Sequence, residues 1–215
     1  MTKSKVYISE DAREEIVSYL KKQGLEPIMI ENPSTDSRKN PIGSHPDLYM
    51  CHLGPYIFHG EKELVGNSYP SDSIYNAACT GRFFIHNLNI TDKRLLDEAR
   101  KLDLTLIDVK QGYTKCNTCV VDENSIITSD AGIAKACRGM LDICLISPGS
   151  IDLKGFKYGF IGGASGRIND EIVFNGNLDA HPDAEIIKEF IYSRGLRIKQ
   201  FEEYSITDIG SIIAE

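Results

Sequence analysis

The chain contains 215 residues, of which 41% are hydrophobic, so it is long enough to bury a substantial core as one large domain or two small ones. Its 31 acidic and 24 basic residues give a formal net charge of −7, and no run of five Lys or Arg residues occurs, which argues against nucleic acid or an anionic membrane as a partner. No stretch approaches the roughly 20 apolar residues that span a bilayer, and the start of the chain lacks the apolar segment of a secretory signal, so we expect a cytoplasmic protein.

The chain begins with a predicted strand, helix and strand. KVYIS (5–9) alternates β-branched or aromatic residues, and DAREEIVSYLKKQG (11–24) places its apolar residues on one helical face. Ser9 or Asp11 is expected to cap this helix. LEPIMIE (25–31) then has the composition of a buried strand.

Three predicted hairpins follow, each with a turn between two short apolar runs. DLYMCHLG and YIFHG meet at residues 54–55, TCVV and SIIT surround residues 122–124, and RI and EIVF surround residues 169–170. A helix and then a strand follow the second and the third hairpin. The repeated unit is therefore hairpin, helix and strand, and such repetition indicates a repeat architecture.

Partial copies of this unit complete the pattern. The segment 82–109 predicts strand, helix and strand with Thr91 or Asp92 as the helix cap, and the C-terminal DIGSIIAE (208–215) predicts a strand without a partner. If this strand pairs with KVYIS, the two ends of the chain close a ring of five units in a single α/β domain, 1–215. The expected units are 1–31 with the strand 206–215, 43–80, 82–110, 112–150 and 157–204.

The triplet His-Pro-Asp occurs twice. The second copy, His181 to Asp183, lies at a predicted helix start, where Pro182 and the acid are favoured, so we interpret it as structural. The first copy, His45 to Asp47, precedes a strand, where no cap is needed and where a loop can aim side chains into a central cavity. A turn in which Asp47 bonds its own backbone is the alternative.

The six cysteines are further candidates for chemistry. In a chain of this length without a secretory signal they are expected to be free thiols, and those in apolar runs behave as small hydrophobes. Only Cys116 and Cys119, in KCNTC, have the C-x-x-C spacing found in metal-binding, nucleophilic and redox sites. The redox role is the least favoured, because nothing places the pair at a helix N-terminus.

The repeated units, the His-x-Asp segment that leads into LYMCHLG, and the Gly-Gly segment of GFIGGASGRINDEIVFNG together resemble the guanidino-group-modifying enzymes. These are the five-bladed α/β propellers, or penteins, that include arginine deiminase, agmatine deiminase and dimethylarginine dimethylaminohydrolase. More narrowly, the chain resembles a small bacterial branch of this fold. The resemblance covers nearly the whole chain in its repeats, but only a few residues in its motifs.

The resemblance implies a cofactor-free hydrolase of a C–N bond in an arginine-like small molecule. In such enzymes a cysteine attacks the guanidinium carbon, a histidine moves protons and carboxylates hold the cation. On this chain His45 matches the histidine and Asp47 the carboxylate two residues on. Cys119 or Cys116 best matches the nucleophile, because both follow a glycine-led loop and enter a predicted strand.

Two features depart from the family's pattern. The family's nucleophile lies near the C-terminus, whereas a complete unit follows the cysteines here, and the acid that usually follows Gly-Gly is missing after Gly162 and Gly163. Gly162 and Gly163 are expected to contact the substrate, and Arg167 is a candidate to bind a substrate carboxylate. The acids that would hold the guanidinium stay unassigned, and the available ones are Asp36, Asp72 and Asp108.

Two alternatives to the hydrolase remain open. Cys116 and Cys119 with His45 and His52 would supply four zinc ligands if the first two hairpins are neighbours, and a ring with a concave centre could also bind a small molecule without catalysis. We expect a small-molecule ligand, neither nucleic acid nor membrane as a partner, and allow for a homodimer. A dinucleotide site is not expected, because the glycines lead into a hairpin and not into a helix.

Overall fold

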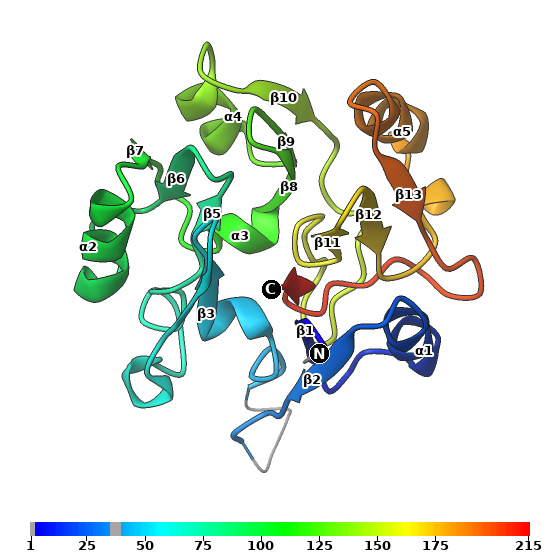
Figure 1. The fold of residues 1–215 in the computed structure, drawn as a ribbon, viewed down its shortest axis with the longest axis horizontal. Coiled ribbons are helices and arrows are strands. Elements are labelled where there is room, and N and C mark those ends of the chain that lie inside the picture. The colour runs from blue at the N-terminus through cyan, green and yellow to red at the C-terminus, as the bar shows by residue number, and fades with distance from the viewer. Residues whose placement is uncertain (1–2, 35–39) are drawn as a thin grey trace.

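The computed structural model describes residues 3–34 and 40–215 and has a mixed α/β fold. The strands of the described residues form five small sheets, which Figure 1 shows spread around a common centre with helices on the outside. These outer helices are α1 (Glu14–Lys22), α2 (Lys93–Lys101), α4 (Ala131–Cys137) and α5 (Ala184–Tyr192). The predicted α/β class is therefore confirmed.

The first sheet joins the two ends of the chain. β1 (Lys5–Ser9) pairs in parallel with β2 (Glu26–Ile30), and α1 connects the two strands. On its other side β1 pairs antiparallel with β14 (Ile213–Ala214). The predicted pairing of the N-terminal strand with the C-terminal segment is confirmed.

The second and third sheets divide the chain differently from the expected units 43–80 and 82–110. The second sheet is the predicted hairpin alone, of β3 (Met50–His52) and β4 (Ile57–His59). The strand that follows turns back at Gly81 and pairs with the next strand, so it belongs to the third sheet. The third sheet contains β5 (Ala78–Cys79), β6 (Phe83–His86) and β7 (Thr105–Asp108).

The fourth and fifth sheets have the predicted hairpin, helix and strand. The fourth contains β8 (Thr118–Asp122), β9 (Ser125–Thr128) and β10 (Asp142–Leu145), with α4 between its last two strands. The fifth contains β11 (Ser165–Ile168), β12 (Glu171–Phe174) and β13 (Arg197–Lys199), with α5 in the same position. In both, the first pair is antiparallel and the second parallel, because a helix carries the chain back along the sheet.

The helix caps agree with the sequence only in part. Asp92 and Asp130 each accept hydrogen bonds from two backbone N–H groups at the starts of α2 and α4. α1 begins one turn later than expected, with Arg13 at the cap position and no side-chain cap, so Ser9 and Asp11 do not cap it. Ser9 Oγ instead accepts from the Asp11 N–H, which closes a turn before the helix.

The buried core consists of clusters that each join two neighbouring sheets. Phe174 and Ile127 belong to a cluster between the fifth and fourth sheets, and Ile126 and Ile85 to one between the fourth and third. Further clusters join the third to the second sheet, the second to the first, and the first to the fifth. The five sheets therefore pack in a closed succession, in which each large buried side chain contributes about 1.5–3 kcal/mol. Within the described residues, no helix has the length and apolar character needed to cross a membrane.

Candidate functional site

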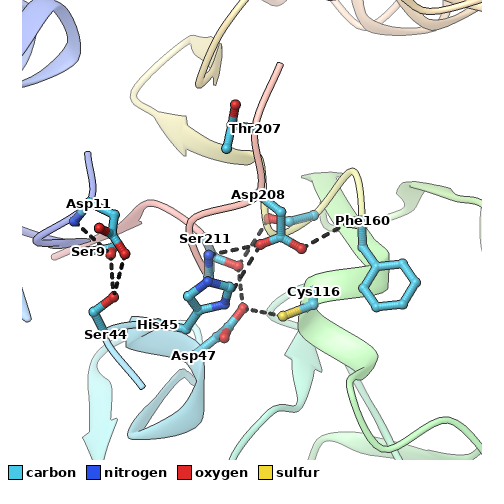
Figure 2. Close-up of polar contacts among 12 residues, drawn as sticks. Ser9, Asp11, Ser44, His45, Asp47, Cys116, Phe160, Thr207, Asp208 and Ser211 are labelled. Atoms are coloured by element: carbon cyan, nitrogen blue, oxygen red, sulfur yellow. Dashed lines mark hydrogen bonds and ion pairs between the residues drawn. The ribbon is translucent and has the colours of Figure 1, made fainter. Parts of the chain in front are cut away.

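The candidate site lies where three segments far apart in the sequence meet (Figure 2). His45 and Asp47 come from the short 3-10 helix Pro46–Leu48 and its cap position, just before β3. Cys116 lies on the four-residue helix α3 (Thr114–Asn117), which precedes β8. Asp208 and Ser211 come from the segment before β14, so the closure of the chain ends completes the site.

Cys116 and Asp47 form the centre of the cluster. The Cys116 Sγ–H donates to Asp47 Oδ2 at 2.9 Å, and both side chains are buried. Burial raises the pKa of the Cys116 thiol well above its ordinary value, and the neighbouring Asp47 and Asp208 carboxylates raise it further. Asn76 fixes the pair, because its amide donates to the Asp47 carbonyl while its oxygen accepts from the Cys116 N–H.

His45 and Asp208 form the second half of the cluster. Their Nδ1 and Oδ1 atoms lie 3.8 Å apart, and both side chains are almost entirely buried. The Asp208 carboxylate is held in place by the backbone N–H groups of Phe160 and Gly210, each at 2.9 Å. Burial raises the pKa of the Asp208 carboxyl, while the nearby imidazole of His45 opposes this shift and the Asp47 carboxylate adds to it.

A lysine reaches the cluster through Ser211. The Ser211 Oγ donates to Asp47 Oδ2 at 2.7 Å and accepts from the Lys115 Nζ at 2.9 Å. Its backbone has φ +76, which is unusual for a residue other than glycine and marks a strained position. A cation thus lies one hydroxyl away from the carboxylate that contacts Cys116.

The predicted glycines pack against the cluster. A Cβ on Gly163 would lie 2.0 Å from Asp208 Oδ1, and a Cβ on Gly162 would lie 2.2 Å from the Lys115 carbonyl oxygen. Only glycine permits these approaches of the backbone to the site. The two glycines therefore let the backbone pack directly against Asp208 and α3. Contact of these glycines with a substrate stays a prediction.

The structure separates the two cysteines of the C-x-x-C pair. We expected both on an entering strand, but α3 intervenes, so Cys116 is on the helix and Cys119 on β8. Cys119 is buried in the apolar cluster with Ile127 and Phe174, and burial raises the pKa of its thiol. Cys116 is thus the member of the pair that meets His45 and Asp47.

The expected zinc ligand set is likewise rearranged. His45, Asp47 and Cys116 each offer one donor atom, and these atoms lie within 4.8 Å of one another. Neither Cys119 nor His52 belongs to this group, and His52 lines a different cavity. One atom of the group, Asp47 Oδ1, is buried without a hydrogen-bond partner.

The remaining predicted residues lie away from the cluster. Asp72 Oδ2 accepts a hydrogen bond from the Tyr113 hydroxyl at 2.6 Å, while Asp72 Oδ1 is buried without a hydrogen-bond partner. Asp108 accepts a hydrogen bond from the Leu88 N–H. Asp36 lies outside the described residues. Arg167 donates to the backbone carbonyls of Asn169 and Val121 and lines the same cavity as Lys115.

The second His-Pro-Asp copy has a structural environment at the start of α5. His181 Nδ1 accepts from the Asp183 N–H, and Asp183 Oδ2 accepts from the Ser147 N–H. These bonds tie the helix start to the loop after β10, in agreement with our structural interpretation of this copy.

Asp208 and Ser211 are the site residues that sequence reasoning missed. Both fall in the C-terminal DIGSIIAE, which we interpreted as a strand from its apolar residues. The strand is in fact only Ile213–Ala214, and the residues before it form a bend with Gly210 at φ +72. The one available signal was the Asp-x-Gly spacing, which is typical of a turn.

Two cavities flank the cluster. One, of about 210 Å³, is lined by His45 and Asp208 together with Arg13, Lys154 and Asn175. The other, of about 460 Å³, has Lys115 and Ser165 among its lining residues. Cys116 lines neither, so a ligand in the smaller cavity would first meet His45 and Asp208.

Comparison with known proteins supports the fold. A crystal structure of dimethylarginine dimethylaminohydrolase in an adduct with 4-chloro-2-hydroxymethylpyridine is similar to this chain with a TM-score of 0.52 and 10% sequence identity. The similarity covers 94% of this chain and 93% of that one, so the two share a fold. No curated protein matches the sequence. A family model matches residues 54–213, which include Cys116, Asp208 and Ser211, and the chain therefore belongs to the Family of unknown function (DUF6873).

Proposed function

We propose that this protein is a cysteine-dependent hydrolase that acts on the guanidino or amidino group of a small molecule. The observation that carries the proposal is the convergence of a thiol, an imidazole and two carboxylates, from Cys116, His45, Asp47 and Asp208, on one buried centre. Such a set supplies a nucleophile, a proton carrier and counter-charges for a cation. The fold shared with dimethylarginine dimethylaminohydrolase supports the same chemistry.

We propose further that the five sheets are the blades of a pentein-type α/β propeller. The larger cavity is lined by residues of β3, β5, β8, β11 and β14, so one strand of every sheet faces the same central space. The closed succession of apolar clusters between neighbouring sheets supports the same arrangement. In this arrangement the cluster adjoins the central space through Lys115, which lines that space and is linked to Asp47 by Ser211.

The charges of the cluster favour a cationic substrate. Asp47 and Asp208 are both buried, and the only imidazole beside them among the described residues is that of His45. A guanidinium is planar and cationic, and its N–H groups match carboxylate oxygens in pairs. It would also occupy Asp47 Oδ1, which has no other partner.

The resting thiol requires activation by the substrate. Burial and the two carboxylates hold the pKa of Cys116 well above its ordinary value, so the cluster alone does not stabilise a thiolate. A bound cation neutralises the carboxylates and therefore lowers the thiol pKa when the substrate is in place. The thiol is thereby protected from oxidation and alkylation in the absence of substrate.

The proposed reaction has two steps. First, the Cys116 sulfur forms a bond to the guanidinium carbon as its proton passes to His45, and the C–N bond to the leaving amine breaks as His45 returns that proton. Second, water adds to the thiouronium carbon with His45 as base, and the C–S bond breaks to regenerate the thiol. The products are a ureido compound and either ammonia or, from a methylated guanidinium, an amine, so atoms balance and no cofactor is needed.

The test is turnover of L-arginine, agmatine and asymmetric dimethylarginine, measured as released amine and ureido product. Cys116→Ala is expected to lower turnover by at least about 10³-fold, because it removes the nucleophile. Cys119→Ala is the matched control, since it removes a buried thiol three residues away and should keep turnover within about threefold. Turnover that survives Cys116→Ala would refute the cysteine mechanism, and binding without turnover would favour the non-catalytic alternative.

A zinc site is the second candidate function. It is supported by the nitrogen, oxygen and sulfur donors of His45, Asp47 and Cys116, a set that suits Zn²⁺ with an open fourth position. Elemental analysis of the purified protein separates the two proposals. About one zinc per chain that is lost in Cys116→Ala but kept in Cys119→Ala would support the metal site, whereas a metal-free, active protein would exclude it.

The environment and partners follow from the proposed function. Six free, buried thiols favour a reducing compartment, so we propose a cytoplasmic location. A small-molecule ligand is the partner that the cluster supports, and a homodimer stays a prediction.

A further inference from the structure

The larger cavity, of about 460 Å³, is not used by the proposed reaction. It is lined by residues of the inner strands and by hairpin-turn residues such as Gly54 and Glu123, whereas His45 and Asp208 line the separate, smaller cavity. We call it the distal cavity. Its volume falls in the range of sites that bind small molecules.

The walls of the distal cavity combine apolar surface with two cations. Met50, Val120 and Ile212 contribute apolar side chains, and Lys115 and Arg167 contribute positive charge. The Lys115 ammonium donates to the Gly162 carbonyl and to Ser211, which uses two of its three N–H groups. Arg167 donates to backbone carbonyls.

Within the described residues neither of these two side chains forms a direct ion pair, although the Asp170 carboxylate interacts electrostatically with Arg167. Among residues 3–34 and 40–215, no carboxylate forms an ion pair with Lys115 or Arg167. The acids of the cavity lie at the β8–β9 turn, where Asp122 accepts from the Asn124 N–H and Glu123 is exposed to solvent. Lys115 is half-buried, whereas Arg167 is exposed. A half-buried cation without a counter-ion attracts an anion more strongly than an exposed one, so Lys115 is the stronger of the two attractions for an anion.

We propose that the distal cavity is a second ligand site that binds a small organic carboxylate. Lys115 is the counter-cation of the carboxylate, Arg167 adds positive charge, and the apolar walls take a short hydrocarbon tail. This site goes beyond the proposed hydrolase, because it involves a different cavity and needs no chemistry at Cys116. Lys115 is linked to Asp47 through Ser211 by two hydrogen bonds, so a ligand bound to Lys115 would lie three hydrogen bonds away from Asp47.

The test uses butyrate with two probes of similar size, n-butylammonium and 1-butanol, followed by NMR of protein labelled at the methionine methyl groups. Met50 lines the cavity, whereas Met29 and Met140 are 38% and 42% exposed and serve as internal controls. Butyrate is expected to shift the Met50 signal saturably and to leave Met29 and Met140 unchanged. The cationic and the neutral probe should cause no comparable shift.

The variants identify the counter-cation. Lys115→Gln is expected to weaken butyrate binding by about tenfold, because a charge-assisted hydrogen bond is lost. Lys110→Gln, an exposed lysine five residues away, should leave the affinity unchanged. If Lys115→Gln does not fold, which the methionine signals would reveal, Lys115→Arg and Arg167→Gln replace it, with affinity kept in the first and lowered in the second.

Several results would overturn the proposal. An unmoved Met50 signal, an equal response to n-butylammonium, or unchanged butyrate affinity in the lysine variant would each do so. The outcome is independent of the proposed hydrolase, because Cys116→Ala should bind butyrate as the unmodified protein does. In the unmodified protein, saturable butyrate binding without turnover would show that the hydrolase proposal alone has failed, and turnover without butyrate binding would show that the second-site proposal alone has failed.

Discussion

Ser211 combines a strained backbone with three polar contacts of its hydroxyl, to Asp47, to Lys115 and to the Gly162 carbonyl. A φ of +76 destabilises a residue that has a Cβ by about 1 kcal/mol or more. Such strain persists where the surrounding contacts determine the conformation. In this site the hydroxyl is the only bridge, among the described residues, between the lysine and the Asp47 carboxylate. The strained backbone conformation therefore positions that hydroxyl between Lys115 and Asp47.

Two variants of Ser211 separate the strain from the hydrogen bonds. Ser211→Gly and Ser211→Ala both lose the contacts to Asp47 and Lys115, but only glycine adopts the positive φ without strain. We expect the alanine variant to be less stable than the glycine variant by about 1 kcal/mol, measured as the free energy of unfolding in urea. Equal stability would mean that the backbone at this position is not strained.

His86 is a buried histidine outside the candidate site. Its Nδ1 lies 2.8 Å from the Thr91 hydroxyl and its Nε2 2.9 Å from the Gly112 carbonyl, in the loop that leads to α3. Burial lowers its pKa from 6.5 to about 4, although the bonds to Gly112 and Ser73 oppose this shift. The imidazole therefore stays neutral in the folded protein under conditions in which it is protonated in the unfolded chain.

This pKa shift predicts a pH dependence of stability. Because the folded pKa is depressed, the unfolded chain binds more protons between pH 6.5 and about 4, so stability falls as the pH decreases through that interval. The contribution of this one group is roughly 2–3 kcal/mol. His86→Gln should be less stable at pH 7 and should show a smaller loss between pH 7 and pH 4; an identical pH slope in both proteins would contradict the assignment.

At the level of elements, β14 is short but closes the first sheet. Ile213 is 3% exposed and packs with Tyr7 and Met50, so it joins the first sheet to the second. The segment before β14 carries Asp208 and Ser211, and the pairing of β14 with β1 anchors that segment. Strand pairing and site assembly are therefore coupled.

Ile213→Asp tests this coupling. A buried, unpaired carboxylate on β14 is expected to lower the free energy of unfolding by at least about 3 kcal/mol. Ile186→Asp is the matched control, because Ile186 is 57% exposed on α5 and should change stability by less than about 0.5 kcal/mol. Urea unfolding followed by circular dichroism measures both, and a similar small effect at the two positions would argue against the burial of β14.

At the level of the whole molecule, the chain ends lie together. The Glu215 N–H donates to the Lys5 carbonyl, and Lys5 and Glu215 thus flank the β1–β14 pair. Apolar clusters join each sheet to both of its neighbours. The packing of the sheets therefore does not depend on any one loop that links two of them. The chain should tolerate new ends at a surface turn.

A circular permutant tests this closure. A short Gly/Ser linker joins the present ends, and new ends are opened at the hairpin turn between Asn169 and Asp170. We expect a folded protein whose stability lies within about 2 kcal/mol of the parent. A permutant opened between Phe84 and Ile85, inside buried β6, is the control that should not fold. If neither permutant folds, the packing around the ring is not sufficient to hold the present chain ends together.

Part of the fold could be predicted because the signals are local. The three hairpins, the helices α2, α4 and α5 and the pairing of the chain ends follow from apolar periodicity, turn residues and caps such as Asp92 and Asp130. The boundary between the second and third sheets could not be predicted from the sequence. The pairing of β5 with β6 depends on which neighbouring strand β5 can reach after the turn at Gly81.

The candidate site shows the same division. The sequence by itself singled out His45, Asp47 and the Cys116/Cys119 pair from residue type and spacing, and it indicated a ring with free thiols. Only the tertiary structure chose Cys116, because the four-residue helix α3 turns that side chain to Asp47 and leaves Cys119 in the apolar core. Only the tertiary structure added Asp208 and Ser211, because closure of the chain ends brings residues 208–211 beside a segment more than 160 residues earlier. The periodicity of apolar residues indicates which side chains are buried, because it depends on neighbours in the sequence. A site built from distant segments depends on tertiary contacts, and no local sequence pattern specifies these.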